Sequence, residues 1–220
     1  MKAALALVIA VTAACSDGNK KPPIDAPPDV LFMGEYVDWD STNNVFCGIN
    51  QATFVVRGDA TRTDLTNPNG RFMLNVTSVG TSLVDIMPPT AGSECLTGMP
   101  TYSLPGLLVA DPAVIATMEI QSTRDFTTTR MGTLGVTLDA AKGHVFAHVD
   151  RTPATVTIST ASDAAQKFDG TAWSAGAQGV NVFFPNVGAG MVTVTMGSAI
   201  GSGTVPVEAG KITYVTLVGG

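Results

Sequence analysis

The two histidines of the chain, His144 and His148, lie four residues apart in the segment GHVFAHVD at 143–150. On a helix, histidines at this spacing share one face and could bind a single metal ion. The segment instead has apolar residues at 145, 147 and 149, an alternation typical of a β-strand. Residues four apart on a strand lie about 13 Å from each other, too far to share an ion. We therefore predict that both histidines face solvent and that the chain has no metal site.

The other residue types that support catalysis show no recognisable pattern. The sequence contains no nucleophile elbow, Walker loop or HExxH motif, and its serines and threonines show no pairing with a histidine. The oxygen-rich stretch Asp38–Asn44 could suit calcium, but it lacks the glycine and terminal glutamate of an EF-hand. Such stretches also form turns for purely local reasons. We predict a protein that is not an enzyme and that carries no cofactor.

Two tryptophans, Trp39 and Trp173, are candidates for a carbohydrate contact, because an exposed indole can stack on a sugar ring. Trp173 follows a segment, 168–172, that reads as a turn. The alternative is that both rings fill the core, since aromatic side chains contribute strongly to burial. The exposure of the two rings separates these possibilities.

The N-terminus carries the clearest indication of where the protein resides. A basic Met1-Lys2 precedes an apolar run at 3–14, which is too short to span a bilayer but typical of an export signal. The sequence Thr12-Ala13-Ala14-Cys15 resembles the lipobox of bacterial lipoproteins, although Thr12 stands where leucine is usual. The resemblance implies removal of residues 1–14 and acylation of Cys15. Ordinary cleavage after Ala14, which would leave Cys15 as a free thiol, fits the same residues.

The segment 15–29 continues SDGNKKPPIDAPPD after Cys15 and holds little that a core could bury. Such a composition stays extended and solvated, so it would tether a folded domain to the membrane lipid. Ser16 in the position after the cysteine resembles the pattern of outer-membrane lipoproteins. We expect an exported protein that is lipid-anchored to the bacterial cell envelope, with the outer membrane as its expected location.

With Cys15 assigned to the anchor, Cys47 and Cys95 remain as an even pair in an exported chain. Disulfides persist outside the cytoplasm, so we predict that the two residues form one. Closing a loop of this size would stabilise the fold by roughly 4 kcal/mol. The alternative is two separate buried thiols.

From residue 30 onward, short β-rich runs alternate with Gly, Pro, Asn and Asp. Residues 72, 74 and 76 share one face, and the runs at 155–159, 191–195 and 212–218 are similar. Period-two patterns of β-branched residues predict half-buried antiparallel strands and an all-β sandwich fold. A short helix is expected at 111–118, and a long ordered loop at 87–110.

A weak internal repeat divides the chain. Each copy, 34–76 and 143–195, runs from a Gly-led strand through an Ala-Thr-led strand to a Pro-Asn turn and a further strand. The turn of the second copy falls at 184–187. We predict two tandem β-sandwich domains at 30–118 and 130–220, joined by a connector at 119–129. A single larger sandwich is the alternative.

Several residues in the first copy carry a family resemblance. The positions that match are Gly34, 52–56, Thr61, Thr63-Asp64, 69–72 and Leu74. This pattern resembles the carboxypeptidase regulatory-like domain, and 143–218 looks like a diverged second copy without the Thr-Asp step. The resemblance implies a prealbumin-like (transthyretin-like) sandwich of about seven strands that serves as an accessory, non-catalytic module.

Composition narrows the functional classes. Charged residues make up 14% of the chain, about half the usual share, and the net charge is −6. An acidic chain is a poor nucleic-acid binder, because phosphates need basic partners. We expect a lipid-anchored envelope protein that acts as a structural or protein-binding module for an unknown protein or glycan. The alternative is a carbohydrate-binding surface lipoprotein, and a metal-dependent enzyme is the remotest reading.

Overall fold

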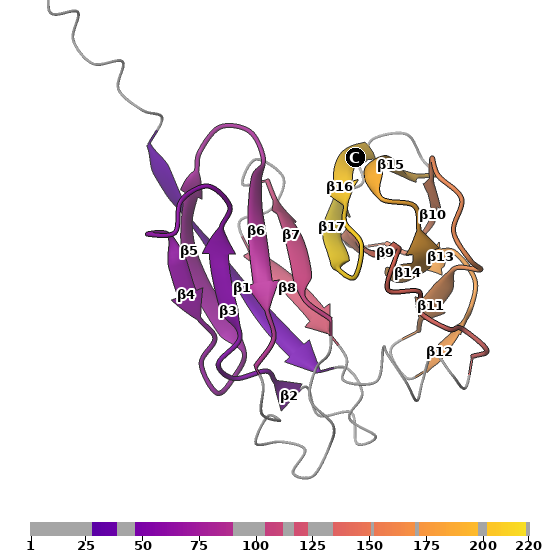
Figure 1. The fold of residues 1–220 in the computed structure, drawn as a ribbon, viewed down its shortest axis with the longest axis horizontal. Coiled ribbons are helices and arrows are strands. Elements are labelled where there is room, and N and C mark those ends of the chain that lie inside the picture. Colours follow the sequence, from indigo (N-terminus) through magenta and orange to yellow (C-terminus); the bar gives the residue numbers. More distant parts are fainter. Residues whose placement is uncertain are drawn as a thin grey trace, which may run out of the picture.

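The computed structural model describes residues 28–38, 47–89, 104–111, 117–122, 134–150, 152–169, 172–197 and 202–218. Throughout these residues the regular structure is β-strand, so the fold class is all-β as predicted. No helix of the described residues is long and apolar enough to cross a membrane. Residues 28–122 form the N-terminal half and residues 134–218 the C-terminal half (Figure 1).

Three sheets contain all the strands of the described residues. The first has four strands: β2 (Cys47–Gly48), β1 (Asp29–Asp38), β5 (Arg71–Thr77) and β8 (Thr117–Ser122), with β8 paired to β1. The second has nine, in the order β12 (Trp173–Ala175), β11 (Gln166–Phe168), β14 (Asn181–Val187), β9 (Gly143–Asp150), β17 (Ile212–Val218), β7 (Gly106–Ala110), β6 (Ser82–Met87), β3 (Thr53–Val56) and β4 (Thr63–Leu65). The third has β13 (Gln178–Gly179), β10 (Ala154–Ile158), β15 (Gly190–Met196) and β16 (Ser202–Val207).

Strand β5 shows how sequence alternation becomes burial. Phe72, Leu74 and Val76 are at most 1% exposed, whereas Met73 between them is 58% exposed. Phe72 stacks on Phe54 of β3 with 4.1 Å between ring centroids, so the first sheet packs face to face on the nine-stranded sheet. The predicted core face of this strand is confirmed.

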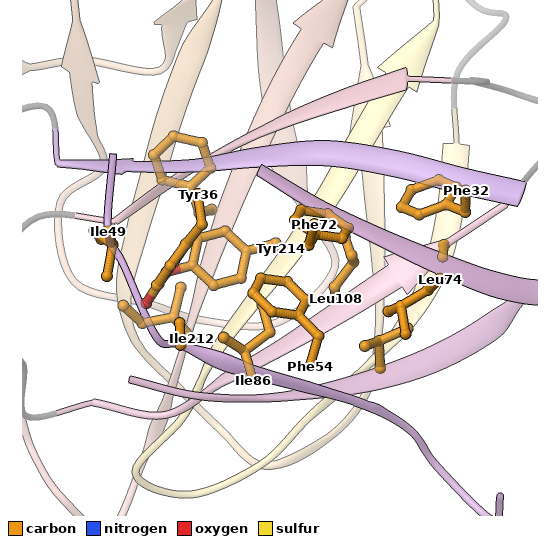
Figure 2. Packing of buried hydrophobic residues seen from close by; sticks show 14 of the residues in the cluster. Phe32, Tyr36, Ile49, Phe54, Phe72, Leu74, Ile86, Leu108, Ile212 and Tyr214 are labelled. Atoms are coloured by element: carbon orange, nitrogen blue, oxygen red, sulfur yellow. The ribbon is translucent and has the colours of Figure 1, made fainter. Parts of the chain in front are cut away.

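Two hydrophobic cores lie on opposite faces of the nine-stranded sheet. Strand β17 contributes to both, because Ile212 and Tyr214 point into the core shared with the first sheet, while Val215 and Leu217 point into the core shared with the third sheet. Figure 2 shows Ile212 and Tyr214 in one cluster with aromatic residues of the N-terminal half such as Phe54. Successive side chains of a strand point to opposite faces, and here both faces are covered.

The sequence predicts half-buried strands in this region, and this prediction is wrong for the central strands of the nine-stranded sheet, because both of their faces are covered. Strands β9 and β14 are buried almost throughout, and both lie in the middle of the wide sheet. The alternation at 145, 147 and 149 correctly marks one face of β9, but Phe146 on the other face is only 2% exposed. A period-two pattern therefore located the strand and missed its second packed face.

Strand β17 joins the two halves into one sheet. This strand pairs in parallel with β9 on one side and, from Ile212 to Tyr214, with Gly106 to Leu108 of β7 on the other. Figure 1 shows β16 and β17 on the side of the C-terminal half that faces β6 and β7. One sheet thus runs through both predicted domains, and its central pairings are parallel rather than antiparallel.

The boundaries of three predicted segments differ from the structure. Strand β8 begins at Thr117 and pairs in parallel with β1, so the end of the expected helix at 111–118 and the start of the expected connector at 119–129 are strand. Strand β7 lies inside the expected loop at 87–110, because Gly106–Ala110 is an apolar run buried between β6 and β17. Strand β1 includes Asp29, the last residue of the expected tether.

Candidate functional site

Strand β9 places the two histidines on the same face as Phe146. His144 is only 1% exposed, which corrects the prediction of a solvent-facing ring, because this face of the central strand is covered. Its imidazole lies 5.8 Å from the Phe183 ring. His148 is half-buried, and its Nδ1 lies 2.7 Å from Asn181 Oδ1 on the neighbouring strand β14. The two rings therefore engage different partners.

A β-bulge in β14 brings polar groups to His144. The pairing of β14 with β9 shifts between Phe184 and Val187, and Asn186 there has a φ of 56°. The segment 184–187, predicted as a turn, is thus a bulge inside a strand. An extra residue in one strand leaves its backbone groups without ladder partners, so they must bond elsewhere. The backbone N–H of Asn186 donates to His144 Nδ1 at 3.1 Å.

The side chain of Asn186 ties two loops to this bulge. Its Nδ2 donates to the carbonyl of Thr137 at 2.7 Å and to Asp163 Oδ2 at 2.6 Å, and its Oδ1 accepts from the backbone N–H of Asp139 at 2.7 Å. Asn186 is 4% exposed, so these bonds satisfy a buried amide. We call His144, Asn186, Asp139 and Asp163 the bulge cluster.

The bulge cluster holds its imidazole neutral. Burial lowers the pKa of His144 to about 4, and the nearby Asp139 carboxylate opposes that change only in part. Because Nδ1 accepts a hydrogen bond from Asn186, the ring proton of the neutral form resides on Nε2. Chemically, this arrangement fixes the bulge and the loop 134–142, since His144 Nδ1 and the side chain of Asn186 bond to backbone groups there. The buried Nε2 of His144 has no hydrogen-bond partner among the described residues.

A second cluster links the two halves through four charged side chains. Arg57, at the end of β3, donates from Nε and Nη2 to both carboxylate oxygens of Asp85 on β6, at 2.9 and 2.6 Å. The same guanidinium contacts Glu208 through Nη1 and Nη2. Lys211 Nζ completes the ring, 2.9 Å from Asp85 Oδ1 and 2.8 Å from Glu208 Oε2. We call these four residues the charge cluster.

The charge cluster has two positive and two negative members, and each cation contacts both anions. The hydrogen bond from Arg57 is the main cause that lowers the pKa of Asp85 to about 2, and hydrogen bonds from Arg57 and Lys211 lower the pKa of Glu208. All four side chains are between 26% and 34% exposed, so water and salt weaken their attraction. The cluster joins the turn 208–211, which leads into β17, to the outer face of β3 and β6.

The sequence pattern gives no sign of the charge cluster. Glu208 and Lys211 are three residues apart, but Arg57 and Asp85 are separated by 28 residues and Arg57 and Glu208 by 151. No local signal in the sequence marks contacts over these distances. They depend on where β17 inserts into the sheet.

Trp173 lies in the core rather than on the surface. This residue is 8% exposed, and its indole has Phe168, Phe146 and Phe183 as aromatic neighbours, the nearest centroid being that of Phe168 at 5.4 Å. Asp169 Oδ1 accepts a hydrogen bond from the Ala172 N–H, and residues 170–171 of the predicted turn lie outside the described residues. Burial leaves no open face of this ring for stacking on a sugar, which corrects the carbohydrate reading at this position.

Of the remaining candidate residues, the structure describes Cys47 alone. Cys15, Trp39 and Cys95 lie outside the described residues, as do all of residues 39–46. Cys47 is the first residue of β2, where its backbone pairs with Asp38. Lipidation at position 15 and the Cys47–Cys95 disulfide therefore stay predictions. Among the described residues, no three His, Cys, Asp or Glu side chains are grouped as metal ligands would be.

Comparisons with known proteins assign no family to this chain. No family model matches the chain, and no curated protein matches it. Among solved structures, a streptococcal ancillary pilin is similar over 87% of this chain and 68% of its own, with 8% identity and a TM-score of 0.25. Two mutants of the shaft pilin SpaA from Lactobacillus rhamnosus GG are similar over 87% of this chain and 99% or 97% of their own, with 8% and 9% identity and TM-scores of 0.28 and 0.27. At these TM-scores no function is inferred from the likeness.

Proposed function

We propose that this protein is a lipid-anchored component of the bacterial envelope whose β-body serves as a non-catalytic structural or protein-binding module. The observation that carries the proposal is the insertion of β17 between β9 and β7, which makes one sheet of both halves. A body joined by backbone hydrogen bonds, a shared core and a charge cluster resists bending at its middle. Such a body would suit a structural spacer or a rigid surface to which a partner binds.

The position of the body relative to the N-terminus supports the anchor. Strand β1 begins at Asp29, directly after the Pro- and Asp-rich segment that follows Cys15. Residues 16–28, if extended, would span roughly 45 Å, enough to hold the body clear of lipid headgroups. Several acyl chains on one cysteine would anchor the protein stably, because a single chain binds only marginally.

The engagement of the polar side chains supports a non-catalytic body. His144 and Asn186 hold the bulge and its neighbouring loop, and His148 bonds to Asn181. A general base must reach the proton of a bound substrate. A neutral His144 that is 1% exposed is poorly suited to that task. The metal-dependent and carbohydrate-binding readings have no observation in their favour among the described residues.

The anchor is tested by comparing the full chain with Cys15→Ser in a bacterial host. We expect the unchanged chain to float with membranes and to yield an N-terminal peptide carrying acyl chains. The variant should appear in the soluble fraction of the envelope or medium. A control, Ser16→Ala, should still float. If Cys15→Ser remains in the membrane fraction, the anchor is wrong.

The rigidity of the body is tested separately on the same soluble variant. Limited proteolysis should leave residues 28–220 resistant as a single unit. Rapid separation into two stable fragments near 123–133 would contradict a body joined through β17.

A further inference from the structure

The turn between β4 and β5 contains Asn69-Gly70, the one Asn-Gly pair in the sequence. The N–H of Gly70 donates to the carbonyl of Asn67 at 2.8 Å and closes the turn. The side chain of Asn67 reinforces it, because Oδ1 accepts from the N–H groups of Asn69 at 2.9 Å and Arg71 at 3.0 Å. The side chain of Asn69 itself is exposed.

The peptide that joins Asn69 to Gly70 is held between two other segments. Gly70 has a φ of +75°, and its carbonyl accepts a 2.8 Å hydrogen bond from the N–H of Tyr36. A Cβ added to Gly70 would lie 2.2 Å from the Tyr36 carbonyl oxygen. On the other side, a Cβ added to Gly48 would lie 2.1 Å from the Asn69 carbonyl carbon and 2.3 Å from the Gly70 nitrogen. The backbone there has no room to rotate.

An asparagine followed by glycine is chemically labile, because glycine has no side chain to obstruct its own nitrogen. In the reaction, the Gly70 nitrogen gives up its proton and attacks Cγ of Asn69, so that a new N–Cγ bond forms. The Cγ–Nδ2 bond breaks, and the amide group leaves with a proton as ammonia. Water then opens the resulting succinimide at one of its two carbonyls. The products are an aspartate at position 69 or an isoaspartate, which carries one additional methylene in the main chain.

We propose that Asn69 is a deamidation site of the unfolded chain whose reaction the folded turn prevents. The nucleophile is the atom that the turn engages, since the Gly70 N–H is donated to Asn67. The attack also requires the Asn69–Gly70 peptide to turn toward Cγ, and this peptide lies tightly against Gly48 and the Tyr36 carbonyl, where not even an added Cβ fits. Opening of the turn must therefore precede the reaction.

The isoaspartate product would be incompatible with the native turn. Its extra methylene lengthens the main chain at a point where less than one methyl group fits on either side. The bond from Tyr36 to Gly70 joins β1 to the start of β5, so a chain that has reacted loses this corner of the first sheet. Chains that have been unfolded for a long time would therefore carry isoaspartate at position 69, and this residue would prevent them from refolding to the native turn.

The test measures deamidation of the full chain by peptide mapping, in native buffer and in concentrated urea at the same mildly alkaline pH. We expect the reaction at Asn69 to be at least about tenfold slower in native buffer, which corresponds to about 1.4 kcal/mol of opening free energy. Asn75, which precedes a valine, is the internal control and should stay largely unreacted in both. Equal rates at Asn69 in both conditions would overturn the proposal.

Two variants test the mechanism and one further measurement tests the product. Asn67→Ala removes two hydrogen bonds from the turn and should accelerate the native reaction severalfold, whereas Thr61→Ala, in a neighbouring turn, should leave it unchanged. An unaltered rate in Asn67→Ala would show that the turn does not control the reaction. Chains reacted in urea are then separated and refolded. If the isoaspartate form regains the stability of the unreacted chain, the marking role is refuted.

Discussion

The charge cluster leads to a prediction about how stability depends on pH. Replacing Arg57 by glutamine removes the two hydrogen bonds to Asp85 and the contacts to Glu208, while Lys211 still bridges the two carboxylates. Glutamine is neutral and keeps the side chain as far as Cδ while lacking the guanidinium, so packing of the aliphatic part against β3 and β6 changes little. The loss is therefore mainly electrostatic.

The size of the effect follows from the pKa of Asp85, which is about 2 in the folded protein against 3.8 for the unperturbed group. Lowering a pKa by one corresponds to about 1.4 kcal/mol, but solvent screens side chains that are about one third exposed. We expect about 1 kcal/mol at neutral pH. Since the folded pKa is lowered, the unfolded chain binds more protons between pH 2 and 4. This stabilisation is thus present above about pH 4 and lost as pH falls through about 2.

The assay is equilibrium unfolding in urea at several pH values, followed through the fluorescence of the buried Trp173. Unchanged Arg57 and Arg57→Gln should differ by about 1 kcal/mol at about pH 6 and converge toward about pH 2. Protonation of His144 affects both proteins equally and cancels in the difference. The matched control is Arg71→Gln, whose ion pair with Glu35 is 65% and 40% exposed and should matter by less than about 0.5 kcal/mol. The reasoning is refuted if the Arg57 difference does not vary with pH or is as small as that of the control.

Three further predictions concern the core, the buried histidine and the cysteines. Phe54→Ala should lower the free energy of unfolding in urea by about 3–5 kcal/mol, because the ring is fully buried. Met73→Ala, on the exposed face of β5, should change it by less than about 0.5 kcal/mol. Similar losses in both variants would contradict the face assignment. His144 should stay neutral in NMR titrations until the pH approaches 4. The stability of the fold should decrease as the pH is lowered from 6.5 to 4, because the unfolded chain takes up a proton in this range and the folded protein does not. Titration of His144 near pH 6.5 would be inconsistent with its burial. In denatured, unreduced protein, Cys47 and Cys95 should resist alkylation and react only after reduction, and alkylation of both beforehand would exclude their disulfide.

The sequence pattern assigns both faces of a strand correctly where one of those faces is open to solvent. In β5 the exposed Met73 separates buried Phe72 and Leu74, so period-two alternation is visible in the sequence itself. The sequence pattern does not predict strand β7, because its five residues GLLVA are buried on both sides and carry no alternation. Short apolar runs of this kind do not reveal their conformation by periodicity.

For the candidate sites too, the sequence predicts local features but not the tertiary contacts of their side chains. Asp169 and Gly170 predict a turn before Trp173, but the direction of the indole depends on the aromatic residues that surround it. The prediction that His144 faces solvent is wrong, because alternation assigns residues to two faces without indicating what covers the second face. The bulge at Asn186 requires a strand partner, β9, before it can be recognised as a bulge.

Residue order alone establishes the all-β class, the strand faces with one open side and the turn chemistry, because these depend on residues within a few positions of each other. The anchor and disulfide predictions likewise rest on residue types. Three features emerge only when the chain has folded: β17 joins the two halves, β9 is covered on both faces, and Arg57 contacts Glu208 across 151 residues. They arise from pairing between distant segments, and local periodicity carries no information on which segments meet.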